Sequence, residues 1–319
     1  MYSVKDICII IPTYNRAEDL RVTLESIKPY IARLGEIIIV DQSTDDLTKK
    51  LVGSLRKKNI TYVRSDVPAL TVARNRGVKA ASRSSKLILF IDDDVSLDKG
   101  YFDEIVRVFN EHPNALGVGG YYLAPGMCEG RFERAIRRLF LIEHHARNSA
   151  RVLSAYGAVY PSELDSIIAA QWIPGFNMTF KRELFSKMKF DEKLRRYSLA
   201  EDFDFTYRVH SLSPGSLYLT PLAKLVHRVS SVERYPAKRI SYMNQAHHFY
   251  LNYKNFNKNA KEAVIFLWAV FGITFLRIAL YLIKPSMRNR LKLYYYFTSL
   301  VYCMSHLSDV KKGIFYIPD

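Results

Sequence analysis

The chain has 319 residues, of which 49 % are hydrophobic, and its formal net charge is +16. Charged residues make up an ordinary 24 % and aromatic residues 13 %, which excludes a chain too polar to form a packed core. The length fits one large domain or one domain with an appendage. The basic balance indicates anionic partners: nucleic acid, a phosphorylated substrate or an acidic membrane surface.

The first 92 residues alternate between short apolar runs and helical patterns. Four runs have the length and β-branched content of buried strands, at residues 7–12, 36–41, 60–65 and 87–92. Helical patterns separate them, through Leu20, Leu24 and Ile27 and then at residues 47–57 and 70–81. This alternation predicts a parallel sheet covered by helices on both faces.

The middle of the chain is less regular. We expect an amphipathic helix at 101–112, a strand or loop at 118–125, an arginine-rich helix with one basic face at 131–151, and a turn, a strand and a helix start at 172–185. Residues 190–210 end in an acidic cluster that is predicted to open a helix.

Three adjacent carboxylates follow the fourth strand in the stretch ILFIDDDVSL, residues 88–97. Asp92 and Asp94 stand two residues apart, so their side chains point the same way in an extended segment. A divalent cation, Mn²⁺ or Mg²⁺, would offset their repulsion and could bind substrate phosphates as well. A solvated turn is the alternative. Since ligands of parallel sheets bind beyond the carboxyl ends of the strands, Thr13, Asp41 and this cluster are expected along one rim.

Several short motifs occur in a characteristic order. They are PTYNR at 12–16, VDQSTDD at 40–46, ARNRG at 73–77, IDDDV at 91–95, GFNMTFKRELF at 175–185 and AEDFDF at 200–205. Together they resemble the inverting family 2 glycosyltransferases over residues 7–230. The resemblance implies a GT-A fold, which is an α/β, Rossmann-like and mostly parallel sheet with flanking helices, at residues 1–230. It also implies a nucleotide-diphospho-sugar donor.

The same resemblance assigns residues to the nucleotide. The loop after the first strand would pack on the base, through Pro12, Thr13, Tyr14 and Asn15. Asp41 would accept a hydrogen bond from the base imide, and Arg74 would lie near the diphosphate. The alternatives are helix caps for Thr13, Asn15 and Asp41, and a surface position for Arg74.

The resemblance also implies roles for the first acidic cluster, Asp92–Asp94, in metal binding. Asp94 would be the main metal ligand, and Asp92 would contact the metal or the ribose, a role that Asp93 could share. His227 lies 25 residues after Asp202, where many relatives carry a metal-binding histidine. A packed or exposed histidine is the alternative.

The Glu-Asp pair matches the family's catalytic base. Asp202 would deprotonate the acceptor hydroxyl, with Glu201 in support and Asp204 as a weaker candidate. Carboxylates at a helix start are also favourable partners of the helix dipole. Gly175 and Asn177 belong to a segment that binds the donor or acceptor sugar in the family.

The C-terminal residues 231–319 carry most of the excess charge. Residues 263–283 are apolar except for Arg277 and Thr274, and their length matches the ~20 residues that cross a bilayer. An aromatic, amphipathic segment follows at 291–307. The two segments could insert as a hairpin, lie flat on the bilayer or cap the catalytic domain, and Arg277 disfavours a clean span. The basic flanks favour association with an anionic membrane surface.

Cysteine usage and the N-terminus bear on the compartment. The three cysteines lie far apart and match no metal-ligand spacing, which is typical of a reducing environment. The first residues lack the pattern of a signal peptide. We therefore expect a cytoplasmic protein at the cytoplasmic face of the cell membrane.

The resulting hypothesis is an inverting, metal-dependent glycosyltransferase that acts on a hydroxyl of a glycan, either free or lipid-linked, in the synthesis of surface polysaccharide. Transfer to a polyprenyl phosphate and a non-catalytic, membrane-bound GT-A scaffold are the alternatives. A nucleotidyltransferase or a dehydrogenase is disfavoured because the first strand is not followed by a glycine-rich loop. No nucleic-acid-binding motif occurs, so nucleic acid is not an expected partner.

Overall fold

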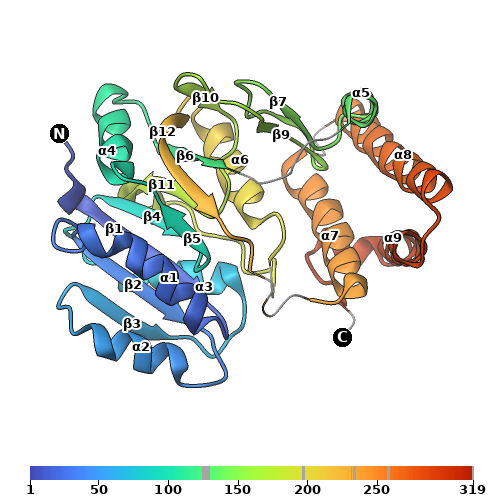
Figure 1. Ribbon diagram of the computed structural model, residues 1–319. Helices are drawn as coiled ribbons and strands as arrows, with labels where there is room; N and C mark the ends of the chain where they lie inside the picture. Colours follow the sequence, from blue (N-terminus) through green and yellow to red (C-terminus); the bar gives the residue numbers. More distant parts are fainter. Residues whose placement is uncertain (124–129, 196–197, 231, 233–234, 257–258, 318–319) are drawn as a thin grey trace. The chain divides into compact units, whose positions relative to one another are not determined.

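Figure 1 shows the computed structural model, which describes residues 1–123, 130–195, 198–230, 232, 235–256 and 259–317. The chain forms two compact units. Unit 1 comprises Met1–Gly126 and Leu164–Glu233, and unit 2 comprises Met127–Glu163 and Arg234–Asp319.

Unit 1 is built on a nine-stranded sheet. Its strands are β1 (Ile7–Thr13), β2 (Glu36–Asp41), β3 (Ile60–Arg64), β4 (Leu87–Ile91), β5 (Val95–Leu97), β6 (Gly117–Leu123), β10 (Ile168–Ala170), β11 (Asn177–Lys181) and β12 (Leu217–His227). Their order is β10-β12-β6-β11-β4-β1-β2-β3, and β5 pairs with β12. The neighbours β3, β2, β1 and β4 are parallel, as is β12 with β6, whereas β11 runs antiparallel to β4 and β6.

Five helices accompany this sheet within the described part of unit 1. They are α1 (Ala17–Ile27), α2 (Leu47–Leu55), α3 (Leu70–Ala80), α4 (Tyr101–Glu111) and α6 (Glu201–Leu212), with short 3₁₀ turns at Val4–Asp6, Lys28–Tyr30 and Arg182–Ser186. Parallel strands need such crossovers, because a tight turn cannot join them.

The two faces of β1 contact different helices. Ile9 and Ile11 belong to one apolar cluster with residues of α1 and α4, while Ile10 lies against Gly77 of α3. Every residue of β1 and β4 is buried, as expected for strands covered on both sides. The predicted α/β fold with a mostly parallel sheet is thus confirmed.

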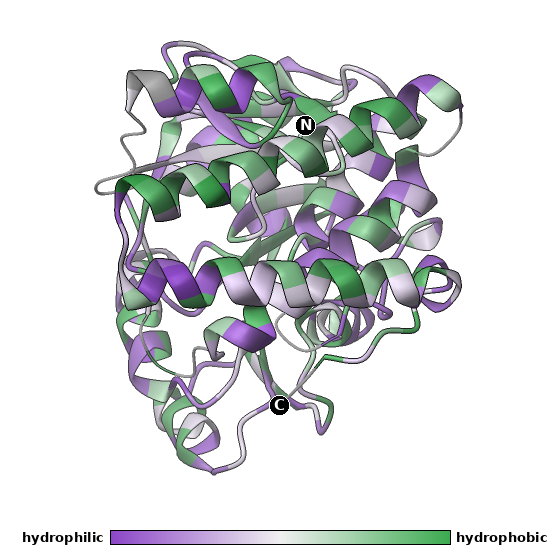
Figure 2. Cartoon of the chain, turned by 90° about the vertical axis from the view of Figure 1, so that its right-hand side faces the viewer, coloured by the Kyte–Doolittle hydropathy of each residue, from purple (hydrophilic) through white to green (hydrophobic). Residues whose placement is uncertain are grey.

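Unit 2 combines short strands with longer helices. Its elements are α5 (Arg131–Leu139), β7 (His144–Ala146), β8 (Val152–Ser154), β9 (Gly157–Pro161), α7 (Ala237–Leu251), a π-helical turn (Asn252–Phe256), α8 (Ala260–Ile283), α9 (Met287–Ser305) and α10 (Leu307–Lys311). The strands form a small sheet in the order β7-β9-β8. Helix α9 packs against both α7 and α8. Hydrophobic residues, green in Figure 2, recur along these helices.

Helix α8 has the length and composition of a membrane-crossing helix. It contains 24 residues, the mean hydropathy of its most apolar 18-residue window is 2.3, and only 22 % of that window is buried. The predicted C-terminal apolar helix is therefore present, and α9 covers most of the segment 291–307 that was expected to be amphipathic.

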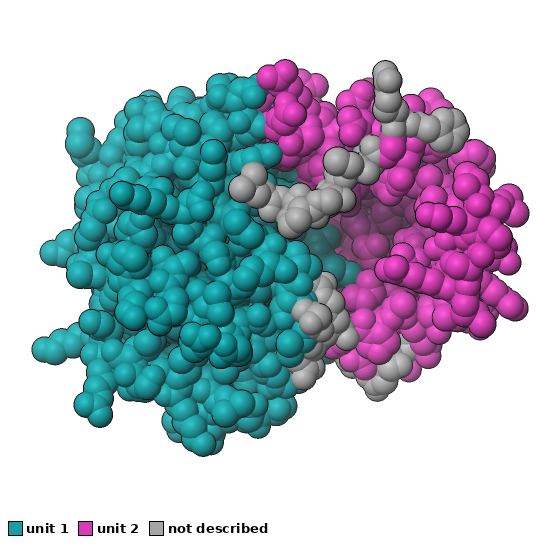
Figure 3. Space-filling model, viewed as in Figure 1, with its two compact units in different colours: residues 1–126, 164–233 teal, residues 127–163, 234–319 magenta. Residues whose placement is uncertain are grey.

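Two predictions differ from the structure. The helix expected over 131–151 is wrong beyond its first half: α5 ends at Leu139, Leu141 has a left-handed backbone (φ 54°), and the chain enters β7. Residues 127–163, which we assigned to the first domain, are grouped with the C-terminal helices (magenta in Figure 3). The predicted strand or loop at 118–125 is a strand to Leu123, and its last two positions lie outside the described residues.

Two helix glycines of unit 1 give a matched pair for testing the sheet's packing. A Cβ on Gly77 would lie 2.4 Å from Cγ2 of Ile10, whereas a Cβ on Gly53 would meet nothing within 4 Å. We expect Gly77→Ala to lower the free energy of unfolding by about 1–3 kcal/mol through overpacking. Gly53→Ala should raise it by about 0.5–1 kcal/mol, because alanine is the better helix former. Urea denaturation followed by circular dichroism measures both, and a stabilised Gly77→Ala protein would contradict the close contact of α3 with β1.

Candidate functional site

Sheet topology brings the predicted site residues of unit 1 to one rim. The parallel strands β1, β2 and β4 end at the same edge, where Thr13 is in register with Asp41. Strand β11 begins there, since Asn177 is opposite Ile91. Strand β12 ends there too, and its pairing with β5 sets His227 opposite Val95. Segments that are far apart in the sequence therefore meet beyond the carboxyl ends of the strands.

Asp94 and His227 form an ion pair at this rim. His227 Nε2 lies 3.0 Å from Asp94 Oδ1, and the backbone N–H of Ser230 donates to Asp94 Oδ2 at 2.8 Å. Burial opposes ionisation of Asp94, but the contact with His227 and the Ser230 hydrogen bond outweigh it and lower its pKa to about 2. Asp94 is therefore a buried anion at neutral pH.

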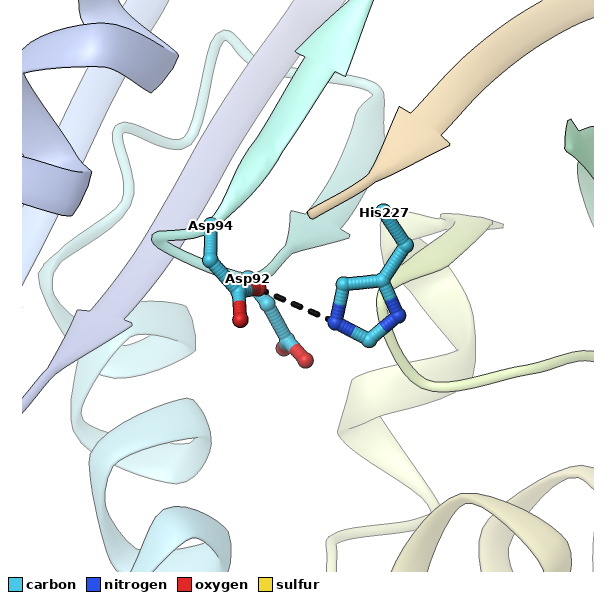
Figure 4. Close-up of side chains that lie close together, drawn as sticks. All are labelled: Asp92, Asp94 and His227. Carbon is cyan, nitrogen blue, oxygen red and sulfur yellow. Dashed lines mark ion pairs between the residues drawn. The ribbon is translucent and has the colours of Figure 1, made fainter. Parts of the chain in front are cut away.

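Asp92 completes a cluster with the donor set of a metal site. One oxygen each of Asp92 and Asp94 and one ring nitrogen of His227 lie within 4.8 Å of one another. Figure 4 shows the three side chains converging from the ends of β4 and β12. Two carboxylates and an imidazole are suitable ligands for a divalent cation such as Mn²⁺. The residues present therefore fit the metal that the sequence predicted.

Asp93 faces away from this cluster. Thr13 Oγ1 donates to its Oδ2 at 2.6 Å, and Arg16 Nη1 lies 3.5 Å from its Oδ1. Burial, only partly offset by these two partners, raises the pKa of Asp93 to about 7. The side chain links the loop after β1 to the loop after β4, and Arg16 extends the link by donating to the carbonyl of Val232.

The loops after β1 and β2 are tied together. The backbone N–H of Asn15 donates to Ser43 Oγ and that of Thr44 donates to Asn15 Oδ1, both at 2.8 Å. Asn15 itself has a left-handed backbone (φ 53°). Of the four residues predicted to pack on the nucleotide base, Pro12 and Thr13 are buried in β1, while Tyr14 and Asn15 are partly exposed. Tyr14 is thus partly accessible to solvent.

Asp41 is fully buried at the end of β2. It accepts hydrogen bonds from the backbone N–H of Ser43 at 2.9 Å, from the hydroxyl of Tyr62 at 2.7 Å and from Arg64 Nη1 at 3.1 Å. A carboxylate has about four acceptor sites. A base imide would therefore join a set of donors that already fixes Asp41 in place.

Arg74 lies at the centre of a second charged cluster. It is 1 % exposed, it forms a close ion pair with Glu201, and its Nη2 donates to the carbonyl of Gly175 at 3.0 Å and lies 3.6 Å from Asp92. The guanidinium also lies over the ring of Phe190, 5.3 Å from its centroid. The structure thus places Arg74 beneath the rim, where it joins the two acidic motifs, and excludes the alternative of a surface arginine.

Glu201 and Asp202 open α6, as predicted. Burial and the neighbouring Asp202 charge raise the pKa of Glu201 to about 8, against the effect of Arg74. Asp202 is partly exposed, and its Oδ2 accepts a hydrogen bond from the N–H of Gly175 at 2.7 Å. A Cβ on Gly175 would lie 2.9 Å from both Arg74 Nη2 and Glu201 Oε1, so any larger residue would have to displace these two paired groups.

Two further site residues expected from the sequence, Asn177 and Asp204, are buried in the interior of unit 1. Asn177 is fully buried, and its side-chain oxygen accepts from the Tyr101 hydroxyl and from the N–H of Gly120. Asp204 is fully buried and pairs with Arg208 one helical turn later, at 2.8 Å. The Asn177 side chain links β11 to α4 and β6, whereas Asp204 pairs with Arg208 within α6. Both side chains are buried, unlike that of the partly exposed Asp202.

Several residues of the site were not found from the sequence. Arg16 stands inside the quoted PTYNR motif, so its charge was visible but its partner Asp93 was not. Tyr62 and Arg64 are two residues apart in β3 and therefore share a face. Ser230 contributes only a backbone N–H, which no side-chain pattern can reveal.

Removing Arg74 tests the second cluster. Arg74→Met leaves the buried Glu201 and the partly exposed Asp92 without their cation, and we expect the free energy of unfolding to fall by about 3–5 kcal/mol. The double variant Arg74→Met/Glu201→Gln should lose less than the sum of the two single changes, because the residues interact directly. Chemical denaturation of the four proteins measures this coupling, and simple additivity would show that Arg74 and Glu201 are independent.

Comparisons with known proteins give this arrangement a family. The family described as glycosyl transferase family 2 matches residues 8–165. The glycosyltransferase GlyA of Streptococcus pneumoniae is 25 % identical over 215 residues, which cover 67 % of this chain and 29 % of GlyA. The GalNAc(5)-diNAcBac-PP-undecaprenol beta-1,3-glucosyltransferase of Campylobacter jejuni is 26 % identical over 189 residues, which cover 58 % of this chain and 54 % of the relative. The chain thus spans about a third to a half of the length of these relatives.

Solved structures share the fold. TarS of S. aureus (residues 1–349) in complex with UDP-GlcNAc superimposes with a TM-score of 0.56 and 14 % identity, over 97 % of this chain and 81 % of that one. GalNAc-T7 with UDP, GalNAc and Mn²⁺ gives a TM-score of 0.60 and 14 % identity, over 98 % of this chain and 58 % of that one. Identities this low speak for a common architecture alone. Sequence match, motif order and shared architecture agree: the chain belongs to glycosyltransferase family 2 and has the GT-A fold.

Proposed function

We propose that the protein transfers a sugar from a nucleotide-diphospho-sugar to a hydroxyl of a glycan acceptor, with inversion at the anomeric carbon. The observation that carries this proposal is the meeting of two acidic motifs at one rim. Asp92 and Asp94 lie beside His227. Arg74 joins Asp92 to Glu201 and to the carbonyl of Gly175, whose N–H donates to Asp202. The names of the relatives support glycosyl transfer.

Asp92, Asp94 and His227 would hold the divalent cation. Bound there, the metal supplies Lewis-acid stabilisation of the departing diphosphate. The imidazole favours Mn²⁺ over Mg²⁺, which prefers oxygen ligands. GalNAc-T7, whose structure contains UDP, GalNAc and Mn²⁺, supports this choice.

Asp202 would act as the general base. Its Oδ2 is oriented by the N–H of Gly175, and its partial exposure leaves it accessible to an acceptor. Glu201 does not compete for this role, because it is buried and paired with Arg74. The proton of the attacking hydroxyl would pass to Asp202 as the glycosidic bond forms.

The proposed acceptor is a lipid-linked glycan at the cytoplasmic face of the cell membrane. The Campylobacter relative is named for an undecaprenol-diphosphate-linked acceptor, and the C-terminal part of this chain is strongly basic, with 14 Lys and Arg against 4 Asp and Glu from Arg228 onward. A polyprenyl phosphate is the second candidate acceptor. It is already an anion, so it needs less help from a base.

A hydrolysis screen of nucleotide sugars identifies the donor and tests the metal. We expect the purified protein to release nucleotide from one or a few donors with Mn²⁺ and to stop when EDTA is added, because the leaving diphosphate is then no longer neutralised. Asp94→Ala should abolish the metal-dependent rate with an unchanged circular dichroism spectrum. The exposed Asp98 is the matched control, and Asp98→Ala should leave the rate intact. Full activity of Asp94→Ala would refute the proposed metal site.

Replacing the proposed base distinguishes the two acceptors. We expect Asp202→Asn to reduce transfer to a hydroxyl acceptor by about 10²–10⁴-fold, the range for loss of general-base catalysis. Uptake of Mn²⁺ and donor, measured by calorimetry, should be unchanged. A small effect on transfer would favour the polyprenyl phosphate instead, and lost donor binding would place Asp202 in the donor site.

A further inference from the structure

One face of α8 in unit 2 is apolar and exposed along its length. The face consists of Val264, Leu267, Trp268, Phe271, Phe275 and Ile278, which are between 38 % and 64 % exposed. They follow one another at steps of one, three or four residues, so they form one continuous face of the helix. We call these six residues the α8 stripe. Exposed apolar faces of this extent mark sites of interaction.

The opposite face of α8 is already packed within unit 2. Phe266, Ala269, Gly272 and Leu276 are buried. A Cβ on Gly272 would lie 2.1 Å from Cβ of Phe140, so the helix contacts this ring closely. Three aromatic residues of the stripe, Trp268, Phe271 and Phe275, lie beside the ring of Phe140, at 4.8–5.9 Å between ring centroids. They nevertheless remain 42–57 % exposed, so the rest of unit 2 covers this side of α8 only in part.

Arg277 points away from the α8 stripe. Its guanidinium lies over the ring of Tyr296 in α9, 5.8 Å from the ring centroid. A helix that crosses a bilayer would carry this cation into hydrocarbon at considerable cost. A helix that lies along the surface keeps Arg277 on the protein side and presents only the stripe to lipid.

Exposed cations flank the stripe. Lys261 precedes it, and Lys284, Arg288, Arg290 and Lys292 follow it, all with exposed side chains. Over residues 259–292, Glu262 is the single acid. This charge complements an anionic surface, whereas two copies of the same basic face would repel each other. The flanks therefore favour lipid over a second copy of the chain as the partner.

We propose that unit 2 binds the surface of an anionic phospholipid bilayer through the α8 stripe, with α8 lying in the plane of the interface instead of crossing the membrane. Apolar side chains would enter the boundary between headgroups and acyl chains, and the flanking cations would contact lipid phosphates. Trp268 is suited to this depth, because tryptophan concentrates at the lipid–water interface. The inference rests on unit 2 alone, so failure of the proposed transfer reaction would leave it standing.

Vesicle flotation of the full chain tests the partner. We expect binding to vesicles of phosphatidylcholine mixed with phosphatidylglycerol and much weaker binding to phosphatidylcholine alone. Phe271→Ser/Phe275→Ser should weaken partitioning at least about tenfold, as loss of buried apolar area requires. Lys284→Gln/Arg288→Gln, which alters only exposed side chains, should weaken it as well and reduce the dependence on anionic lipid, because two of the five flanking cations are then lost.

A control keeps this result interpretable. Leu47 and Leu222 of unit 1 are 57 % and 59 % exposed, and Leu47→Ser/Leu222→Ser should bind vesicles like the parent chain. If Phe271→Ser/Phe275→Ser binds vesicles as strongly as the parent chain, the proposal is overturned. A dimer of the parent chain in the absence of lipid, detected by light scattering, would also overturn the proposal if Phe271→Ser/Phe275→Ser converts it to a monomer. The α8 stripe would then be an interface between copies of the chain.

Fluorescence of Trp268 tests the orientation. The chain contains two tryptophans, and Trp172 is 2 % exposed, so a Trp268→Phe variant supplies the background signal. We expect lipids brominated near the headgroup to quench Trp268 more than lipids brominated near the chain ends. A crossing α8 would place Trp268 about 5 Å from the bilayer centre, at 1.5 Å per residue from the middle of the helix. Stronger quenching by the deeper bromines would overturn the in-plane orientation.

Discussion

Separation of three adjacent carboxylates is the constraint on which the site depends. Asp92, Asp93 and Asp94 follow one another directly, and each faces a different partner: Arg74, the pair of Thr13 and Arg16, and His227. The repulsion between the three carboxylates is therefore offset by a separate partner for each of them. The pKa values diverge accordingly, since burial raises that of Asp93 to about 7 while its partners lower that of Asp94 to about 2. One short acidic run thus yields a structural side chain and two candidate ligands.

Arg74 extends this network to the second acidic motif. Its single guanidinium joins Asp92, Glu201 and the carbonyl of Gly175, and the N–H of Gly175 in turn orients Asp202. The position of the proposed base is therefore coupled to the position of the proposed metal ligands through one buried cation. Such preorganisation is the usual means by which enzymes position charged groups for reaction.

The local sequence pattern made the strands and the acidic residues of the rim predictable. Apolar runs revealed β1, β2 and β4, and the acids at their ends marked the rim because parallel strands end together. The partners were not predictable, since Tyr62 and Arg64 reach Asp41 only through sheet pairing. The helix expected over 131–151 failed for the same reason. Its arginine-rich composition indicated one helix with a basic face, but the chain turns at Leu141 to pair β7 with β9, a contact that a local pattern does not contain.

The composition of unit 2 has a consequence for how the protein is made. Residues 127–163 are followed by seventy residues of unit 1 before the rest of unit 2 appears in the chain. During synthesis, which proceeds from the N-terminus and allows domains to fold as units, this early segment must wait for its helical partners. Phe140 meets α8, and Tyr156 stacks on His248 and Phe266. A nascent or truncated chain that stops before α8 would therefore leave these aromatic rings uncovered, and it would be a natural substrate for chaperones.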